Sequence, residues 1–488
     1  MRSMPYDSRL ASYAKPRRVG RSRVFLLTHI LVTSLVVGAG AATPIDQLDS
    51  GRLVYPASLL ATATLVWILW SWYSLRKTLF DPYALFMIAA GLFNSGQALL
   101  EVFGMNPGGI LLGEANVDTL IRSLFLVAIS MLLVHAGALA ALDRKSRQKP
   151  SGSSDSDREK ATRLTGWMLM GVAFVPTFNL LKGSFDLVLD YGYMGLYTHR
   201  IATPLSYALA GFMVPGLIFL MSGSRKSRWI QLFCLSFMAL YAGAFLFFGA
   251  RAAATMSCVA VAWVYESSIR RIPRTLITLL AIAALLIFPL VRETRNLSGK
   301  DRLSMANQYE TVSNLENPGS SSISEMGHSL VTVTDTLTLV PEIRPFDLGA
   351  SYFYAATTIV PNLGWEVHPA VAHGLLSDWL IDTVDPIVAE AGGGLGFSFI
   401  AESYLNFGWI GGPLCLGLIG FLVASLFLMA DSPDPAKRAM VGSFLSFFFV
   451  FARGESAIVA RGLVWYAVMP YLVVTALTIR NRRRKALA

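Results

Sequence analysis

The sequence predicts an all-α polytopic membrane protein with about twelve transmembrane helices and one large loop. Hydrophobic residues make up 54% of the 488 positions and charged residues 15%, whereas soluble domains carry about 25% charged residues. Mean hydropathy is high, at +0.53. Apolar stretches of about twenty residues, the length that crosses a bilayer, recur along the chain between short polar turns.

Twelve segments meet the length and composition expected of a span. Two of them, which begin at Ala252 and Ala439, are shorter than the others. The predicted spans are Val24–Ala42, Leu53–Tyr73, Pro82–Phe103, Asp118–Leu142, Leu164–Leu181, Ala202–Met221, Ile230–Phe248, Ala252–Ser267, Thr275–Val291, Phe407–Met429, Ala439–Phe451 and Leu463–Ile479.

The spans and the polar segments between them divide the chain into six parts. The parts are residues 1–142 (N-terminal tail and four spans), 143–163 (flexible cytoplasmic linker), 164–291 (five spans), 292–399 (large loop), 400–479 (re-entrant segment and three spans) and 480–488 (basic cytoplasmic tail).

The basic residues predict the orientation of the chain. Lysine and arginine accumulate in cytoplasmic segments of membrane proteins. With both termini in the cytoplasm, the predicted cytoplasmic segments hold 29 of the 41 lysines and arginines. The large loop then lies on the opposite side of the membrane. The net charge of +10 is therefore a signal of topology, and we expect no nucleic-acid partner.

The large loop, which runs from Arg292 to Phe399, is the one long segment that is too polar to lie in a membrane. Long loops in such chains usually carry function. Within it, Met326–Val340 is expected to be a helix or a strand, and Leu375–Thr383 an amphipathic helix on the membrane surface. Glycine clusters on both sides of Phe397–Phe407 predict a bent or re-entrant entry into the following span.

The sequence predicts neither disulfides nor a metal site. The three cysteines, Cys234, Cys258 and Cys415, all lie in apolar spans, and the six histidines are scattered. We therefore expect no cofactor and no metal.

Five arginines are expected near the outer membrane boundary, on the side where positive charge is scarce. Charged groups at that depth are costly and usually functional. Guanidinium groups bind phosphate oxygens through paired hydrogen bonds, so the five can hold a lipid diphosphate and stabilise it as a leaving group without metal. Alternatively, each side chain extends to lipid headgroups. The arginines are Arg251, Arg292, Arg295, Arg453 and Arg461.

Two residues are candidates for a catalytic base. Glu402 lies in an apolar segment, where loss of solvent strengthens a carboxylate as a base; the alternative is a structural ion pair with one of the arginines. His328 in the large loop is the second candidate, with a purely structural role as its alternative.

On the same side of the membrane, the tyrosines of Lys182–Arg200 are either membrane-interface residues or a platform for sugars.

Several of these motifs together resemble those of the Wzy-type O-antigen and exopolysaccharide polymerases. The matching stretches are Phe248-Gly249-Ala250-Arg251, Arg292-Glu293-Thr294-Arg295, the loop segment from Gly349 to Asn362, and the glycine-rich segment from Gly393 to Gly412. The resemblance extends from Leu164 to the C-terminus, and the first four spans fit by hydropathy alone.

The resemblance implies a metal-independent membrane glycosyltransferase of GT-C-like architecture in a bacterial inner membrane, with the large loop in the periplasm. Such an enzyme joins repeat units carried on undecaprenyl diphosphate, in contact with membrane lipids, and its expected partners are a chain-length regulator and a flippase. An O-antigen ligase and a lipid-linked oligosaccharide flippase are the alternatives; the long loop argues against a flippase.

Overall fold

The computed structural model describes residues 19–42, 50–106, 108–147, 156–199, 201–295, 297, 304, 318–362 and 364–487. All regular structure in these ranges is helical. Residues 148–155 of the predicted linker and much of the first part of the large loop lie outside the described residues.

The helices, which keep these labels below, are α2 (Val19–Ala42), α3 (Ser50–Arg76), α4 (Pro82–Val102), η2 (Ile110–Gly113), α5 (Val117–Ser146), α6 (Ser156–Tyr191), α7 (Gly195–Thr198), α8 (Pro204–Ala210), α9 (Met213–Ser222), α10 (Arg228–Phe247), α11 (Arg251–Ser268), α12 (Arg274–Arg295), α15 (Pro318–Gly327), α16 (Leu330–Leu339), α17 (Ala350–Thr357), α18 (Pro369–His373), α19 (Leu376–Val384), α20 (Pro386–Glu390), α21 (Phe399–Leu428), η3 (Met429–Asp431), α22 (Pro435–Phe448), η4 (Phe449–Arg453), α23 (Ser456–Gly462), η5 (Leu463–Val468) and α24 (Met469–Leu487).

The described part of the chain has ten helices long and apolar enough to cross a membrane, which confirms the predicted all-α polytopic class. The two short predicted spans, Ala252–Ser267 and Ala439–Phe451, are absent from those ten. Both segments are nevertheless helical, as α11 with 18 residues and α22 with 14. The count of twelve spans stays a prediction.

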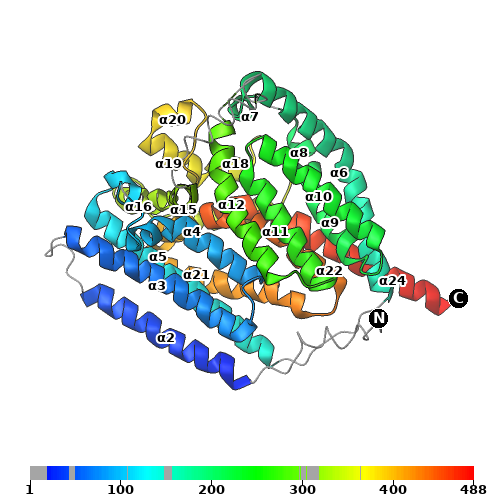
Figure 1. Cartoon of the computed structure of the whole chain (residues 1–488), viewed down its shortest axis with the longest axis horizontal. Helices are drawn as coiled ribbons and strands as arrows, with labels where there is room; N and C mark the ends of the chain where they lie inside the picture. The colour runs from blue at the N-terminus through cyan, green and yellow to red at the C-terminus, as the bar shows by residue number, and fades with distance from the viewer. Residues whose placement is uncertain are drawn as a thin grey trace.

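Close packing of glycines joins the N-terminal and C-terminal parts of the bundle. A Cβ atom on Gly137 of α5 would lie 2.0 Å from the carbonyl oxygen of Gly417 in α21. A Cβ atom on Gly420 would lie 2.2 Å from the carbonyl oxygen of Val134. Small residues let membrane helices approach this closely, and the gain is van der Waals contact between backbones. Helix α5, the last of the first four spans, is therefore packed against α21 (Figure 1).

An ion-pair network joins the same two parts at one end of the bundle. The Arg76 guanidinium donates to both carboxylate oxygens of Asp431, at 2.9 and 2.8 Å, and to Asp81 at 3.0 Å. Arg158 pairs with Asp434 at 2.7 Å, and Lys485 with Asp157 at 2.6 Å. These contacts bring together segments 143–163, 431–438 and 480–485, all of which the charge pattern assigns to one side of the membrane.

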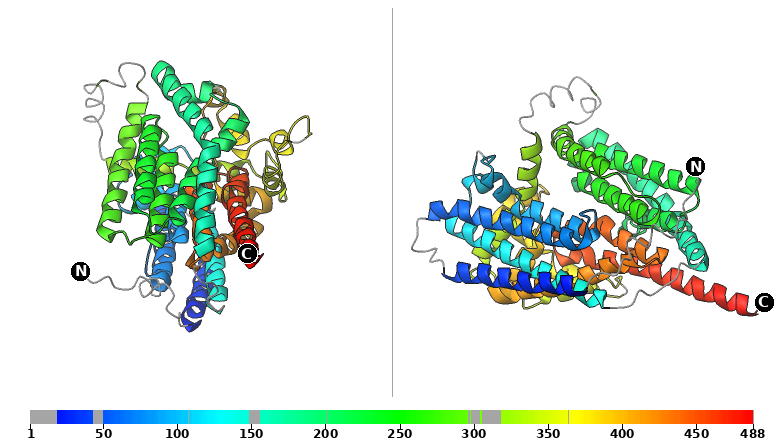
Figure 2. Two further views of the ribbon diagram at one scale, coloured as in Figure 1. Left: turned by 90° about the vertical axis from the view of Figure 1, so that its right-hand side faces the viewer. Right: turned by 60° about the horizontal axis from the view of Figure 1, so that its bottom comes forward.

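The helices of the large loop, α15 to α20, form a cap at the other end. Figures 1 and 2 show this cap and α7 at one end of the molecule and the C-terminal end of α24 at the opposite end. Helices α16 and α19 lie where the sequence predicts ordered segments. The carboxylate of buried Glu455 accepts hydrogen bonds from the backbone N–H groups of Leu376 and Ser377, at 3.0 and 3.1 Å, and so fixes the start of α19.

The entry into α21 is bent, as the flanking glycines predict. Gly408 has φ 66° and ψ −160° inside the helix, a conformation that residues other than glycine avoid. The bend separates the turns around Glu402 from the longer apolar part of α21. This confirms a bent entry into the span.

Candidate functional site

The turn between α10 and α11 places Arg251 beside the cap. Gly249 has φ 85°, and a Cβ atom there would lie 2.9 Å from the Cβ of Arg295 and 3.0 Å from the Tyr193 ring, so glycine suits both the turn and the packing. Arg251 begins α11 and donates to the carbonyl of Phe288 at 2.7 Å and to both carboxylate oxygens of Glu325. Helix α12 is thereby tied to α15 through one guanidinium group.

The last turn of α12 carries two further arginines of the group. Arg292 lies 3.8 Å from Glu293 and 4.0 Å from Glu325, measured between nitrogen and oxygen. The guanidinium of Arg295 stacks over the Tyr193 ring, 4.5 Å from its centroid. Their spacing of three residues places them on neighbouring faces of one turn, so both approach the Arg251–Glu325 pair.

Helix α15 packs between the membrane helices α4 and α12 and so positions Glu325 there. A Cβ atom on Gly96 of α4 would lie 2.9 Å from the carbonyl oxygen of Ile323, so the two helices are in close contact. The hydroxyl of Ser322 donates to the carbonyl of Leu285 in α12 at 2.7 Å. Burial opposes ionisation of Glu325, but the hydrogen bonds and charge of Arg251, with Arg292 and Arg295, lower its pKa. The carboxylate is therefore charged and holds the arginines together.

Arg453 joins this group from η4. Phe397 donates to the carbonyl of Arg453 at 3.4 Å, and Gly396, at φ 75°, leaves room for the guanidinium, which lies 5.6 Å from the centroid of the Phe93 ring. Burial lowers the pKa of Arg453, with Glu325 raising it and Arg251 lowering it further. The residue is nonetheless exposed to solvent.

His328 lies at the edge of the same group, one residue beyond the end of α15. It is exposed. Burial lowers its pKa, Glu114 opposes that shift, and Arg292 and Arg453 lower the pKa further. The imidazole is thus neutral at pH 7 and able to accept a proton. Arg251, Arg292, Arg295 and Arg453, with Glu325 and His328, are called the arginine cluster below.

Arg461, the fifth predicted arginine, has different surroundings. Its guanidinium lies 6.0 Å from the centroid of the Trp465 ring, and the Trp465 indole donates to the carbonyl of Ile359 at 2.9 Å. Within the described residues no contact links it to the other four arginines. The predicted group of five is therefore a group of four in the structure.

Glu402 is fully enclosed, with 1% of its surface exposed. One carboxylate oxygen accepts hydrogen bonds from the hydroxyls of Ser351 and Ser456, at 2.9 and 2.6 Å. The other accepts the backbone N–H of Ser456 at 2.7 Å. Asn406 donates to Ser351 at 2.7 Å and accepts the backbone N–H of Gly349 at 2.8 Å. This arrangement ties α21 to α17 and α23.

The partners of Glu402 bear on both roles predicted for it. Among the described residues no arginine pairs with its carboxylate, so the predicted alternative of an ion pair finds no support. Because both oxygens are occupied by serine groups, the geometry favours a positioning role. The role of Glu402 as a base stays a prediction.

The comparison with protein families bears on the function of the chain as a whole. A family model described as O-antigen polysaccharide polymerase Wzy matches residues 25–484. This chain belongs to the Wzy family. The match confirms the resemblance and extends it through the four N-terminal spans, which fitted by hydropathy alone. Comparison with curated proteins and with solved structures found no match.

Membership identifies the protein as an O-antigen polysaccharide polymerase, a multi-pass membrane enzyme of polysaccharide biosynthesis. It favours polymerisation over the ligase and flippase alternatives. The likeness to GT-C architecture stays a prediction.

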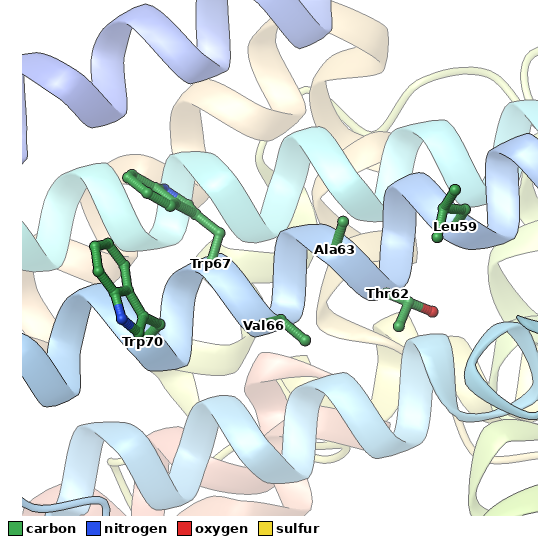
Figure 3. Close-up of a pocket in the computed structure, with 6 residues that line it drawn as sticks. All are labelled: Leu59, Thr62, Ala63, Val66, Trp67 and Trp70. Atoms are coloured by element: carbon green, nitrogen blue, oxygen red, sulfur yellow. The ribbon is translucent and has the colours of Figure 1, made fainter. Parts of the chain in front are cut away.

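A surface pocket on α3 lies away from the arginine cluster. It has a volume of about 520 Å³ and is lined by six residues of α3, among them Trp67 and Trp70. Figure 3 shows that all six belong to this one helix. Trp70 is 53% exposed, as expected for a side chain in contact with lipid. We assign no role in the reaction to this surface.

Sequence reasoning missed Glu325 and the way Tyr193 supports Arg295. Glu325 stands three residues before His328, and this closeness in sequence to a candidate base was the available signal. Tyr193 belongs to a loop considered for sugars, but no sequence pattern indicates its contact with Arg295. Such contacts depend on which helices are neighbours.

Proposed function

We propose that this polymerase transfers a glycan from undecaprenyl diphosphate to the terminal sugar hydroxyl of another lipid-linked repeat unit. The reaction takes place at the periplasmic face of the inner membrane. The observation that carries the proposal is the arginine cluster, in which the guanidinium groups of Arg251 and Arg292 lie within 4.0 Å of Glu325 and those of Arg295 and Arg453 interact with it electrostatically. An anionic diphosphate is the part of the substrate that such a group binds best.

The chemistry follows from the charges that develop during transfer. A bond forms between the acceptor oxygen and the anomeric carbon, and the bond from that carbon to the phosphate oxygen breaks with its electron pair. Negative charge grows on the leaving diphosphate, where preorganised guanidinium groups stabilise it. The acceptor proton passes to a base, and neutral His328 at the edge of the cluster is suited to take it. The mechanism requires no metal, because the arginines supply the positive charge.

The cluster arginines give the first prediction. Replacing Arg251, Arg292 or Arg295 with alanine should abolish polymer in cells while protein levels stay normal. Lysine should restore little, because a point charge cannot reproduce the planar fork of guanidinium. The measurement is the lipopolysaccharide ladder on gels: a strain without polymerase activity makes core with a single repeat unit, whereas loss of a ligase leaves bare core.

Arg52 provides the matched control for this experiment. It is an exposed arginine at the start of α3 and lies outside the cluster, so Arg52→Ala should keep the full ladder. Near-normal ladders from all three cluster variants would mean that these arginines contact lipid headgroups and would remove the proposal.

A further inference from the structure

Two tyrosines lie directly beside the arginine cluster, in the turn between α6 and α7. Tyr193 supports Arg295 with one ring face, at 4.5 Å, and its edge packs on Gly249. Tyr197 follows one helical turn later, and the ring centroids of the two tyrosines are 5.2 Å apart at 65°. The field of Arg453 acts on both phenols. Tyr193 therefore contacts the cluster directly, and the hydroxyl of Tyr197 is hydrogen-bonded to that of Tyr193.

One hydroxyl proton of the two tyrosines remains available to donate a hydrogen bond toward solvent. Their oxygens are 2.7 Å apart, so one hydroxyl donates to the other. That bond uses one of the two protons, and within the described residues no acceptor is found for the second. Tyr197 is 61% exposed. The surrounding protein and Tyr193 raise the pKa of Tyr197 to about 12, against the charges of Arg295 and Arg453, so the phenol remains a donor at physiological pH.

A second aromatic surface continues from this pair. The rings of Tyr191 and His199 are stacked, with centroids 4.5 Å apart and an interplanar angle of 23°. Tyr191 is 57% exposed. Sugar rings combine an apolar face with a rim of hydroxyl groups. Aromatic faces next to free phenolic hydroxyls suit both features.

We propose that Tyr193 and Tyr197 form the subsite for the sugar that is bonded directly to the donor diphosphate. The inference rests on the proposed function, since the arginine cluster must first hold the diphosphate. Arg295 then marks the boundary between the two parts of the ligand, because it belongs to the cluster and stacks on Tyr193. The pair recognises a hexose or similar ring through the free hydroxyl of the phenol pair, and Tyr191 extends the contact to the next sugar.

The test compares two lipids on the purified full-length polymerase. One is the lipid-linked repeat unit isolated from a strain lacking the polymerase, and the other is undecaprenyl diphosphate without sugar, used as an inhibitor. For Tyr197→Phe we expect the KM of the repeat unit to rise about threefold to tenfold, the effect of one lost hydrogen bond. The kcat and the inhibition constant of the sugar-free lipid should stay within about twofold of wild type.

Tyr207→Phe is the matched control, because Tyr207 is 47% exposed on α8 and lies outside the subsite. It should match wild type in every constant. Should Tyr197→Phe lower the melting temperature, Tyr193→Phe removes the same hydrogen bond from the other side and takes its place.

The outcomes separate this inference from the proposed function. Unchanged constants for both lipids, or an equal weakening of both, would overturn the sugar subsite and leave the arginine cluster intact. Failure of the sugar-free lipid to inhibit the wild type would instead remove the diphosphate assignment, and the subsite with it.

Discussion

Three of the four arginines of the cluster have surroundings of different kinds. Arg251 is held by a carboxylate and a backbone carbonyl, Arg295 stacks on the face of a tyrosine, and Arg453 packs beside Gly396 and the Phe93 ring. The guanidinium groups of Arg251 and Arg295 are thus oriented by protein contacts before a ligand arrives. Preorganised charge is worth more to a leaving group than charge that must rearrange.

The two possible roles of Glu402, positioning neighbouring helices or acting as a base, predict different effects on melting temperature and activity. If it positions α17 and α23, Glu402→Gln replaces one acceptor with a donor beside Ser456 and Ser351. We expect a loss of about 1–3 kcal/mol in stability for such a buried polar mismatch, seen as a lower melting temperature, with polymer still formed.

A base would behave in the opposite way. Removing it should reduce the rate by a factor of about 10² to 10⁴ and leave the melting temperature unchanged. A stable but inactive Glu402→Gln protein would therefore restore Glu402 as the base and remove that role from His328.

His328 gives a prediction on pH. Its pKa lies below the ordinary value of 6.5 through burial and the nearby arginines, so the base form is present at neutral pH and is lost as the pH falls through that lowered pKa. We expect kcat/KM to be level near pH 7 and to decline on the acid side at a pH below about 6.5.

His328→Gln should lower kcat/KM by a factor of about 10² to 10⁴ and abolish this acid limb. The phosphate groups of the substrate also titrate, so an acid limb can come from the substrate as well as from His328. An acid limb that persists unchanged in His328→Gln belongs to the diphosphate and contradicts the role of the histidine.

At the scale of elements, local sequence patterns predicted the features that depend on a few consecutive residues, namely a bend and a short helix. Glycines flanking an apolar stretch predicted the bend that Gly408 makes in α21. Amphipathic spacing predicted a helix at Leu375–Thr383, and the structure has α19 there. Each of these features follows from a few consecutive residues, because backbone freedom and the pattern of buried faces are local properties.

The contacts between elements could not be predicted in the same way. Residues 292–399 are predicted to be a loop on one side of the membrane, but α15 inside that segment packs between α4 and α12 and brings Glu325 to the arginines. Glu402 is predicted to be a base or the partner of an arginine, but Ser351 and Ser456, from distant parts of the chain, bind its carboxylate. The positions of Glu325 and Glu402 both depend on packing between distant segments, and no periodic pattern in a single sequence indicates which distant segments pack together.

At the scale of the whole molecule, the cap and the basic segments lie at opposite ends. Ion pairs such as Arg158–Asp434 and Lys485–Asp157 gather the predicted cytoplasmic segments, while the cap and α7 share the other end (Figures 1 and 2). Since lysine and arginine accumulate on the cytoplasmic side, the arginine cluster is expected in the periplasm. The side on which the cap is exposed therefore determines which pool of substrate the site can use.

This orientation can be tested by labelling single introduced cysteines with a maleimide that does not cross the inner membrane. Val371→Cys in the cap, where the native side chain is 70% exposed, should be labelled in spheroplasts. Leu487→Cys near the C-terminus, 90% exposed in the native chain, should be labelled only after lysis. The unmodified chain with its three native cysteines gives the background. Labelling of Leu487→Cys in spheroplasts, with Val371→Cys protected, would place the cap in the cytoplasm and exclude a periplasmic reaction, because the cluster and the cap lie at the same end.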